Sequence, residues 1–275
     1  MTCDPFSPAT KDEYVPVETV PGAPDAALLL LCDHASNRVP PELGDLGLPP
    51  SEFERHIAYD IGMRGVTLAL AERLNAPATL STTSRLVIDP NRGEDDPTLL
   101  MRLSDGAVVP GNARAGALEK RRRIERYHRP YHDAVSARLD AMVDAGLTPA
   151  VIALHSFTPA WKGVARPWHI GLLWDRDDRI AAPLLAALRA EGDLVVGDNE
   201  PYDGALKGDT MHRHGTRRGF PHVLVEIRQD LVADAAGQEA WADRLARLLP
   251  PILARPEIGH IAHYGSRTDV RRQTP

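Results

Sequence analysis

Three observations predict an α/β fold with a mostly parallel sheet and helices on both faces. Short apolar runs lie between polar turn residues, as is typical of buried strands; they include Leu28–Cys32, Val151–Leu154 and Val223–Val225. Segments with helical periodicity separate these runs. Strands and helices therefore alternate along the chain, and this alternation is typical of parallel sheets covered by helices.

The elements can be placed in order along the chain. Strands are expected at residues 27–32, 85–88, 150–154, 169–174, 194–196 and 222–227. Helices are expected at residues 51–75, 115–145, 178–190 and 238–253. Ser51 followed by Glu54 has the spacing of a capping box and predicts the start of the first helix. Pro130 predicts a break or kink in the second.

The ends of the chain differ in composition from its middle. Residues 1–24 contain five prolines without sustained periodicity, so we expect an N-terminal extension there. Residues 256–275 are polar and basic, which predicts a C-terminal tail. No repeat or clear linker divides the rest, and we expect a single catalytic domain over residues 25–255.

Composition limits the classes of partner. The net charge of −6 gives no reason to expect nucleic acid or an anionic membrane as a partner. No apolar run approaches the length of about 20 residues that spans a bilayer, and no signal peptide is evident. The two cysteines, Cys3 and Cys32, have no metal-binding spacing, and reduced thiols fit a cytoplasmic protein. A small-molecule substrate is the expected partner, and a homo-oligomer is left open.

Three of the apolar runs end on residues that can hold or serve a metal. His34, His155 and Glu226 each lie at or just after a predicted strand end, where open α/β sheets bind their ligands. A catalytic zinc site takes three protein ligands, so a third is needed beside the two histidines. Asp60 is the candidate; the alternative is a salt bridge to Arg64.

Glu226 is the candidate general base, because a carboxylate beside a metal-activated water can take its proton. An ion pair with Arg228 is the structural alternative for Glu226.

The segment Ser84–Arg92 is the densest polar cluster. Arg92 with Asn91 could hold a substrate carboxylate, because the guanidinium fork matches a carboxylate. Arg85 could do the same or polarise the scissile carbonyl. Structural pairing with Asp89 or Glu94 is the alternative for both arginines.

Other histidines compete as ligands. His128 and His132 have a helical i,i+4 spacing, but Pro130 between them favours a structural role. His212 and His214 alternate on an expected loop and could contact substrate or solvent.

Four ordered motifs together resemble the N-formylglutamate amidohydrolase family, in the branch usually labelled "predicted". They are residues 33–40 (DHASNRVP), 84–92 (SRLVIDPNR), 155–159 (HSFTP) and 225–230 (VEIRQD). The resemblance covers about residues 26–250. It implies a zinc-exopeptidase-like, three-layer α/β/α fold (phosphorylase/hydrolase-like), with a mixed sheet of about eight strands.

The resemblance also implies residue roles. His34, His155 and Asp60 match the family's expected zinc ligands, and Glu226 its expected base. Together with Arg85, whose role is inferred from its guanidinium, Glu226 makes up the expected catalytic pair. The expected substrate-binding residues are Asn91, Arg92, His214 and Arg228. One departure is Asn37, which stands where carboxypeptidase relatives carry the glutamate of HxxE.

The implied activity is zinc-dependent hydrolysis of the amide of an N-acylated acidic amino acid, with N-formyl-L-glutamate giving formate and glutamate, as in histidine catabolism. Two alternatives remain. One is a zinc peptidase or deacylase with another N-acyl amino acid or peptide substrate. The other is a non-catalytic binding relative that has lost firm metal binding, an alternative motivated by Asn37.

Overall fold

The computed structural model describes residues 14–269, and its centre is a seven-stranded mixed sheet. The strand order is β1-β3-β2-β6-β11-β9-β10. The strands are β1 (Val17–Val20), β2 (Leu28–Cys32), β3 (Ala78–Ser81), β6 (Ala150–Phe157), β9 (Ile170–Leu173), β10 (Val196–Asp198) and β11 (His222–Arg228). Strands β3, β2, β6 and β11 are parallel, whereas β1 and the β9–β10 pair run the opposite way. The predicted mostly parallel, mixed sheet is therefore confirmed, with seven strands where about eight were expected.

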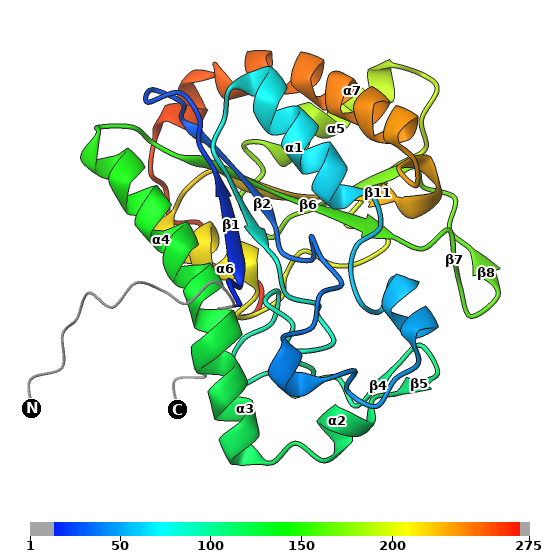
Figure 1. Ribbon diagram of the computed structural model, residues 1–275. Helices are drawn as coiled ribbons and strands as arrows, with labels where there is room; N and C mark the ends of the chain where they lie inside the picture. The colour runs from blue at the N-terminus through cyan, green and yellow to red at the C-terminus, as the bar shows by residue number, and fades with distance from the viewer. Residues whose placement is uncertain (1–13, 270–275) are drawn as a thin grey trace, which may run out of the picture.

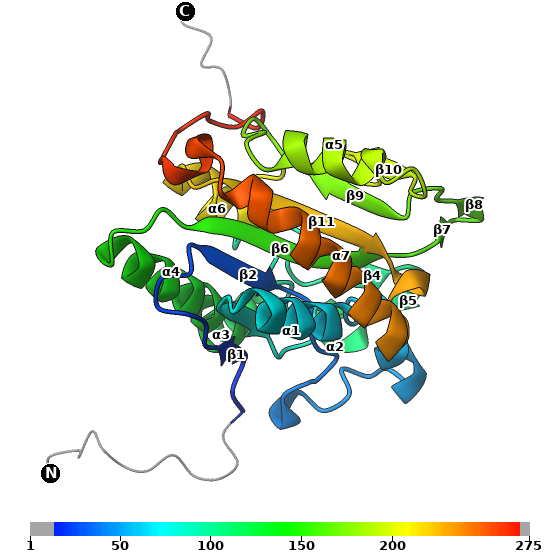
Figure 2. The same cartoon turned by 90° about the horizontal axis from the view of Figure 1, so that it is seen from above.

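Helices cover both faces of this sheet, which makes three layers (Figures 1 and 2). On one face lie α1 (Met63–Leu74), α5 (Ala181–Ala190) and α7 (Ala235–Leu253). On the other face lie α4 (Arg129–Asp144) and α6 (Thr210–His214), and α4 continues the shorter α3 (Ala117–Arg123). Short elements complete the chain: α2 (Pro110–Ala113) and the hairpins β4–β5 (Leu103–Ser104, Ala107–Val108) and β7–β8 (Ala160–Trp161, Val164–Ala165).

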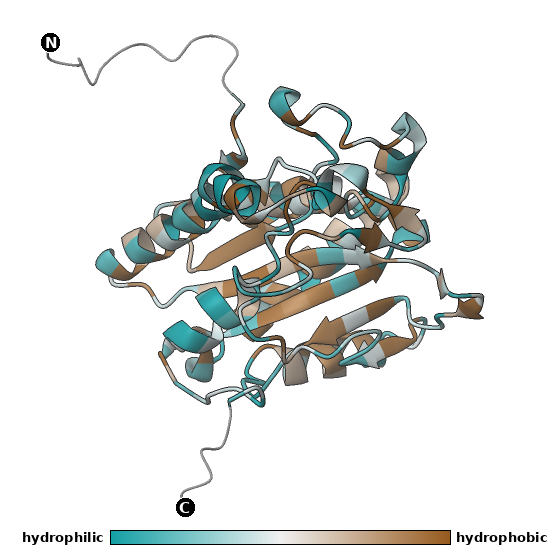
Figure 3. Cartoon of the chain, turned by 90° about the horizontal axis from the view of Figure 1, so that it is seen from below, coloured by the Kyte–Doolittle hydropathy of each residue, from teal (hydrophilic) through white to brown (hydrophobic). Residues whose placement is uncertain are grey.

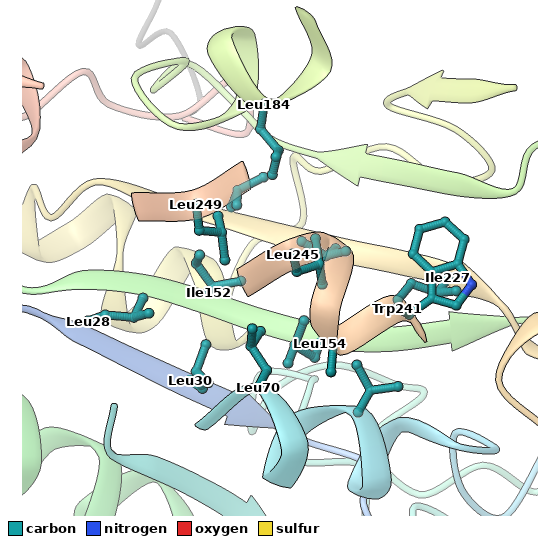
Figure 4. Packing of buried hydrophobic residues seen from close by; sticks show 14 of the residues in the cluster. Leu28, Leu30, Leu70, Ile152, Leu154, Leu184, Ile227, Trp241, Leu245 and Leu249 are labelled. Carbon is teal, nitrogen blue, oxygen red and sulfur yellow. The ribbon is translucent and has the colours of Figure 1, made fainter. Parts of the chain in front are cut away.

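Alternate residues of the central strands fill two separate cores. In β2, Leu28 and Leu30 face α1 and α7, whereas Leu29 and Leu31 face α4. This follows from the two-residue period of a strand, because both faces of the sheet are buried. Figure 4 shows the first core, where Leu245 and Leu249 of α7 pack over the sheet. The strands are accordingly coloured as hydrophobic in Figure 3.

The segment after the first motif forms less helix than the sequence predicts. Residues 50–54 form only a short 3-10 turn, and α1 begins at Met63. Gly62 sets this start, because its φ of 82° is left-handed and a Cβ there would meet the carbonyl oxygen of Val232 at 2.1 Å. Asp60 therefore precedes the helix and does not lie in the middle of it.

The prediction of a strand at residues 85–88 is wrong. These residues form a turn, in which the N–H of Val87 donates to the carbonyl of Ser84 and the Ser84 hydroxyl accepts from the N–H of Leu86. Their apolar side chains are buried in a third core beneath the loops, so burial alone gave the run its strand-like pattern. The strand at this point of the fold is β3, which the sequence did not predict.

The second helix changes its winding before the predicted kink. Residues Ile124–His128 form a π-helical stretch between α3 and α4, which ends two residues before Pro130. Pro130 has no N–H to donate, and the π-helical stretch changes the hydrogen-bond ladder just before the position where this donor is missing.

Both end segments contain described residues that contact the rest of the domain. Strand β1 lies within the expected N-terminal extension and pairs antiparallel with β3. Within the expected tail, Arg267 lies 2.9 Å from a carboxylate oxygen of Asp175. Residues 1–13, including Cys3, and residues 270–275 lie outside the described part. No helix within residues 14–269 is long and apolar enough to cross a membrane.

Candidate active site

The sheet topology brings the predicted site residues to one edge. The chain moves outward from β2 to β3 on one side and later continues with β6 on the other, so the order reverses between β2 and β6. In open α/β sheets such a reversal opens a crevice at the carboxyl ends of the strands. His34 follows β2 at this point, and His155 lies near the end of β6. Glu226 of β11 is the register partner of His155, so both side chains leave the same face on neighbouring strands.

His34, Asp60 and His155 form a buried group with the geometry of a metal site. Each offers one ligand atom, and the three atoms lie within 4.8 Å of one another. The Nδ1 atoms of His34 and His155 lie 3.3 and 2.8 Å from the same Asp60 oxygen. The three side chains are at most 4% exposed. Asp60 lies in the loop that precedes α1, and this loop carries it to the site. There the Asp60 N–H donates to the carbonyl of His34.

Two further aspartates determine which nitrogen of each histidine faces Asp60. His34 Nε2 lies 2.7 Å from Asp89, and His155 Nε2 lies 2.8 Å from Asp33. Because an ionised carboxylate can only accept, each Nε2 carries the hydrogen. In a neutral ring each Nδ1 then has a lone pair, directed at the Asp60 carboxylate. Metal-ligating histidines are commonly oriented in this way.

This arrangement fits a cation at the centre of the group. Three electron-pair donors converge there, and without positive charge they would repel one another. In the protein alone that charge is a proton. Burial by itself would lower the pKa of His155, but its hydrogen bonds to Asp33 and Asp60 raise it well above the usual value. A divalent metal meets the same requirement with the nitrogen and oxygen ligands that zinc prefers.

The two supporting aspartates are themselves hydrogen-bonded. Asp33 accepts from the hydroxyls of Tyr131 at 2.7 Å and Thr210 at 2.9 Å. Asp89 pairs with Arg85 at 2.7 Å and accepts from the N–H of Asn91 at 2.9 Å. Both carboxylates are fully buried, and these contacts fix their orientation.

Glu226 is the buried acidic group whose position suits proton transfer. Burial raises its pKa to about 7, although the charge of His155 opposes the shift. Its Oε2 has no hydrogen-bond partner among the described residues. An unpartnered buried carboxyl oxygen is costly, and it is expected where a substrate or a water completes the site. The predicted alternative, an ion pair with Arg228, does not form, since Arg228 pairs with Asp230.

A cavity of about 320 Å³ opens over this group. Its lining includes all three residues of the histidine–aspartate group, as well as Glu226 and Arg85. Asn91 and Arg92 also line it, and Arg92 has no carboxylate within 4 Å in the described chain. The volume and the mixture of apolar walls with a few polar groups are typical of small-molecule sites.

Comparison with known proteins agrees with this geometry. The family model for N-formylglutamate amidohydrolase matches residues 26–233. The chain belongs to the N-formylglutamate amidohydrolase family. A crystal structure of a gene product of Agrobacterium tumefaciens is similar at 35% identity, with a TM-score of 0.84 over 89% of this chain and 97% of that one.

A second solved structure is similar in fold. It is an N-formylglutamate amidohydrolase from Ralstonia eutropha JMP134, at 22% identity, with a TM-score of 0.66 over 86% of this chain and 96% of that chain. A search of curated proteins finds no significant match. The family resemblance and the α/β fold expected from the sequence are thus confirmed.

Two residues expected to bind substrate in this family member lie elsewhere. His214 is 1% exposed, and its Nε2 lies 2.9 Å from Nδ1 of His132, so it stacks behind the cavity wall. Arg228 pairs with Asp230 and points to the carbonyls of Arg166 and Trp168. Neither lines the cavity, so the structure gives no contact through which either residue would reach a ligand there. The motif positions alone did not show on which side of the wall these side chains lie.

The competing ligand residues also have structural roles. Nε2 of His128 and His132 lies 2.9 Å from the carbonyl oxygens of Arg92 and Pro90, respectively. These two contacts hold the chain on either side of Asn91. Asn37 donates to the carbonyl of Phe53 and lies outside the histidine–aspartate group.

Sequence reasoning missed the supporting roles of Asp33 and Asp89. Asp33 directly precedes His34, and Asp89 follows the buried turn, so both were visible as acidic residues beside predicted ligands. Their pairing is crossed, because Asp33 supports His155 and Asp89 supports His34. Which aspartate supports which histidine is determined by the tertiary fold alone.

Proposed function

We propose that this protein is a zinc-dependent amidohydrolase of N-acylated acidic amino acids, with N-formyl-L-glutamate as the reference substrate. The observation that carries the proposal is the convergence of the Nδ1 atoms of His34 and His155 with the Asp60 carboxylate, beside Glu226 and in one cavity. Family membership supports amide hydrolysis as the reaction class.

His34, Asp60 and His155 would hold the metal. When bound, zinc supplies Lewis-acid chemistry, which polarises a carbonyl and lowers the pKa of water. The supporting aspartates keep both Nδ1 atoms directed at the metal position. Asn37 does not leave the site without a carboxylate, because Asp60 occupies the third corner. The motivation for a non-catalytic relative is therefore weakened.

Glu226 would move the proton during hydrolysis. Its unpartnered Oε2 accepts a proton from the attacking water and passes it to the nitrogen of the leaving amine. One water and one amide thus give one carboxylate and one protonated amine. Arg85 lines the cavity and can donate to the oxygen that becomes negative at the carbonyl.

Asn91 and Arg92 would bind the substrate carboxylate. Since Arg92 has no acidic partner in the described chain, its guanidinium is available to a ligand. Its Nη1 donates to the carbonyl of Asn91, which orients the fork. This favours an acidic amino acid as the amine half of the substrate.

The Glu226→Gln variant tests the proposal. We expect purified wild-type protein to contain about one zinc per chain and to release formate from N-formyl-L-glutamate. Glu226→Gln should retain the zinc and lose about 10²–10⁴-fold in kcat, the usual contribution of a general base. A wild-type protein without activity after zinc is added, or an equally active variant, would refute the proposal.

A further inference from the structure

The cavity extends beyond the histidine–aspartate group toward the β7–β8 hairpin. Phe157 ends β6 two residues after His155, so its side chain leaves the same face of the sheet. The hairpin follows directly, as Figure 1 shows, and its Trp161 also lines the cavity. Tyr202, from the loop after β10, lines it as well. We call Phe157, Trp161 and Tyr202 the aromatic rim.

The aromatic rim is organised around a single cation. The guanidinium carbon of Arg166 lies 5.0 Å from the ring centroid of Tyr202, 5.5 Å from that of Trp161 and 5.8 Å from that of Phe157. These distances are within the range of cation–π attraction. The half-buried side chain of Arg166 therefore contacts all three rings of the aromatic rim, which come from three segments of the chain.

Arg166 is fixed by neutral partners. It donates to the hydroxyls of Thr158 at 3.0 Å and Tyr202 at 3.1 Å. Among the described residues no carboxylate lies within salt-bridge distance of it. The contacts of Arg166 thus orient the rings, and within the described residues its charge is not paired with a carboxylate.

The aromatic rim leaves part of its ring surface exposed in the same cavity as the histidine–aspartate group. Trp161 is 39% and Tyr202 45% exposed, although both contribute to the cavity wall. Exposed apolar surface that continues into a cavity commonly marks a ligand contact. Phe157 is already buried, but a formyl group has a single carbon and cannot cover the two exposed rings. The cavity of about 320 Å³ is within the range that holds drug-sized ligands.

We propose that the aromatic rim is a subsite for a planar acyl group, so that the substrates include N-aroyl acidic amino acids. The inference rests on the proposed function, because it places the scissile amide at His34, Asp60 and His155 and the carboxylate at Arg92. The acyl group then occupies the remaining, aromatic part of the cavity. Ring-on-ring contact with Trp161 and Tyr202 supplies the preference.

Binding to a Glu226→Gln variant tests this inference without requiring turnover. N-benzoyl-L-glutamate and N-formyl-L-glutamate are titrated calorimetrically into the variant loaded with zinc. We expect the benzoyl ligand to bind at least about tenfold more tightly, the order of effect for an added aromatic contact. Adding Trp161→Ala should remove this difference and leave the Kd of the formyl ligand within about twofold. Val164→Ala on the same hairpin is the matched control, since Val164 is 70% exposed and does not line the cavity.

The outcomes separate this inference from the proposed function. Equal Kd values for the two ligands, or a Trp161→Ala effect on both alike, would overturn the aromatic subsite. Wild-type turnover of the two compounds is measured separately. If both bind as expected and neither is hydrolysed with zinc present, the proposed function fails while the subsite stands.

Discussion

His34 Nε2 lies 2.7 Å from the Asp89 carboxylate, across 55 residues of sequence. The contact places the hydrogen on Nε2 and leaves Nδ1 to face Asp60. His155 and Asp33 repeat the relationship on the neighbouring strand. The site is therefore organised by two crossed aspartate–histidine pairs around one further carboxylate.

Replacing Asp89 should weaken metal binding. In Asp89→Asn the neutral amide is a poorer acceptor for His34 and cannot form the ion pair with Arg85. We expect zinc affinity, measured by competition with a chelator, to fall about 10–100-fold, as for other supporting carboxylates. Asp230→Asn is the matched control, because within residues 14–269 Asp230 pairs only with Arg228, outside the histidine–aspartate group. Equal zinc affinity in both variants would contradict the supporting role.

Arg92 and Arg228 should differ in their effect on catalysis. Both are arginines of family motifs, but only Arg92 lines the cavity. Arg92→Lys replaces a fork with a point charge, and we expect kcat/KM for N-formyl-L-glutamate to fall about 10–100-fold. Arg228→Lys should stay within about twofold of wild type. The opposite order would place the carboxylate site at Arg228.

Acid should destabilise the protein, because histidines that are buried behind the cavity wall are neutral in the folded state. Burial lowers the pKa of His214 to about 3, and the ordinary value of about 6.5 applies in the unfolded chain. Between these values only the unfolded chain binds the proton, so the free energy of unfolding falls as pH falls from 6.5 toward 3. For His214 alone the loss is about 2 kcal/mol between pH 7 and pH 5.

His214→Gln should reduce this pH dependence. Urea unfolding at pH 7 and pH 5, with chelator present, measures it. His260→Gln is the control, because His260 is exposed. If His214→Gln shows the same loss between the two pH values as wild type and the control, the buried neutral histidine is not its source.

The sequence was most informative where burial and chemistry coincide in one short segment. The apolar runs before His34, His155 and Glu226 predicted β2, β6 and β11, and the rule for strand ends predicted one shared edge. Strand β3 was missed because its four residues include Thr79 and Ser81, which weaken the apolar pattern. Strand β1 lies among prolines and depends on pairing with β3.

The side-chain environment of the site was less predictable. Asp60 was placed correctly among the metal candidates but on a helix, because the left-handed φ of Gly62 depends on close packing against Val232. His214 and Arg228 lie in family motifs, yet contacts with His132 and Asp230 direct them away from the cavity. Such directions depend on residues far apart in sequence.

The most direct test of the metal centre is an anomalous difference map, recorded at the zinc edge, from crystals grown with zinc. We predict a single strong peak about 2.0–2.2 Å from Nδ1 of His34, Nδ1 of His155 and a carboxylate oxygen of Asp60. No peak at this position, or zinc held through the Nε2 atoms with Asp33 and Asp89 displaced, would contradict the proposed centre.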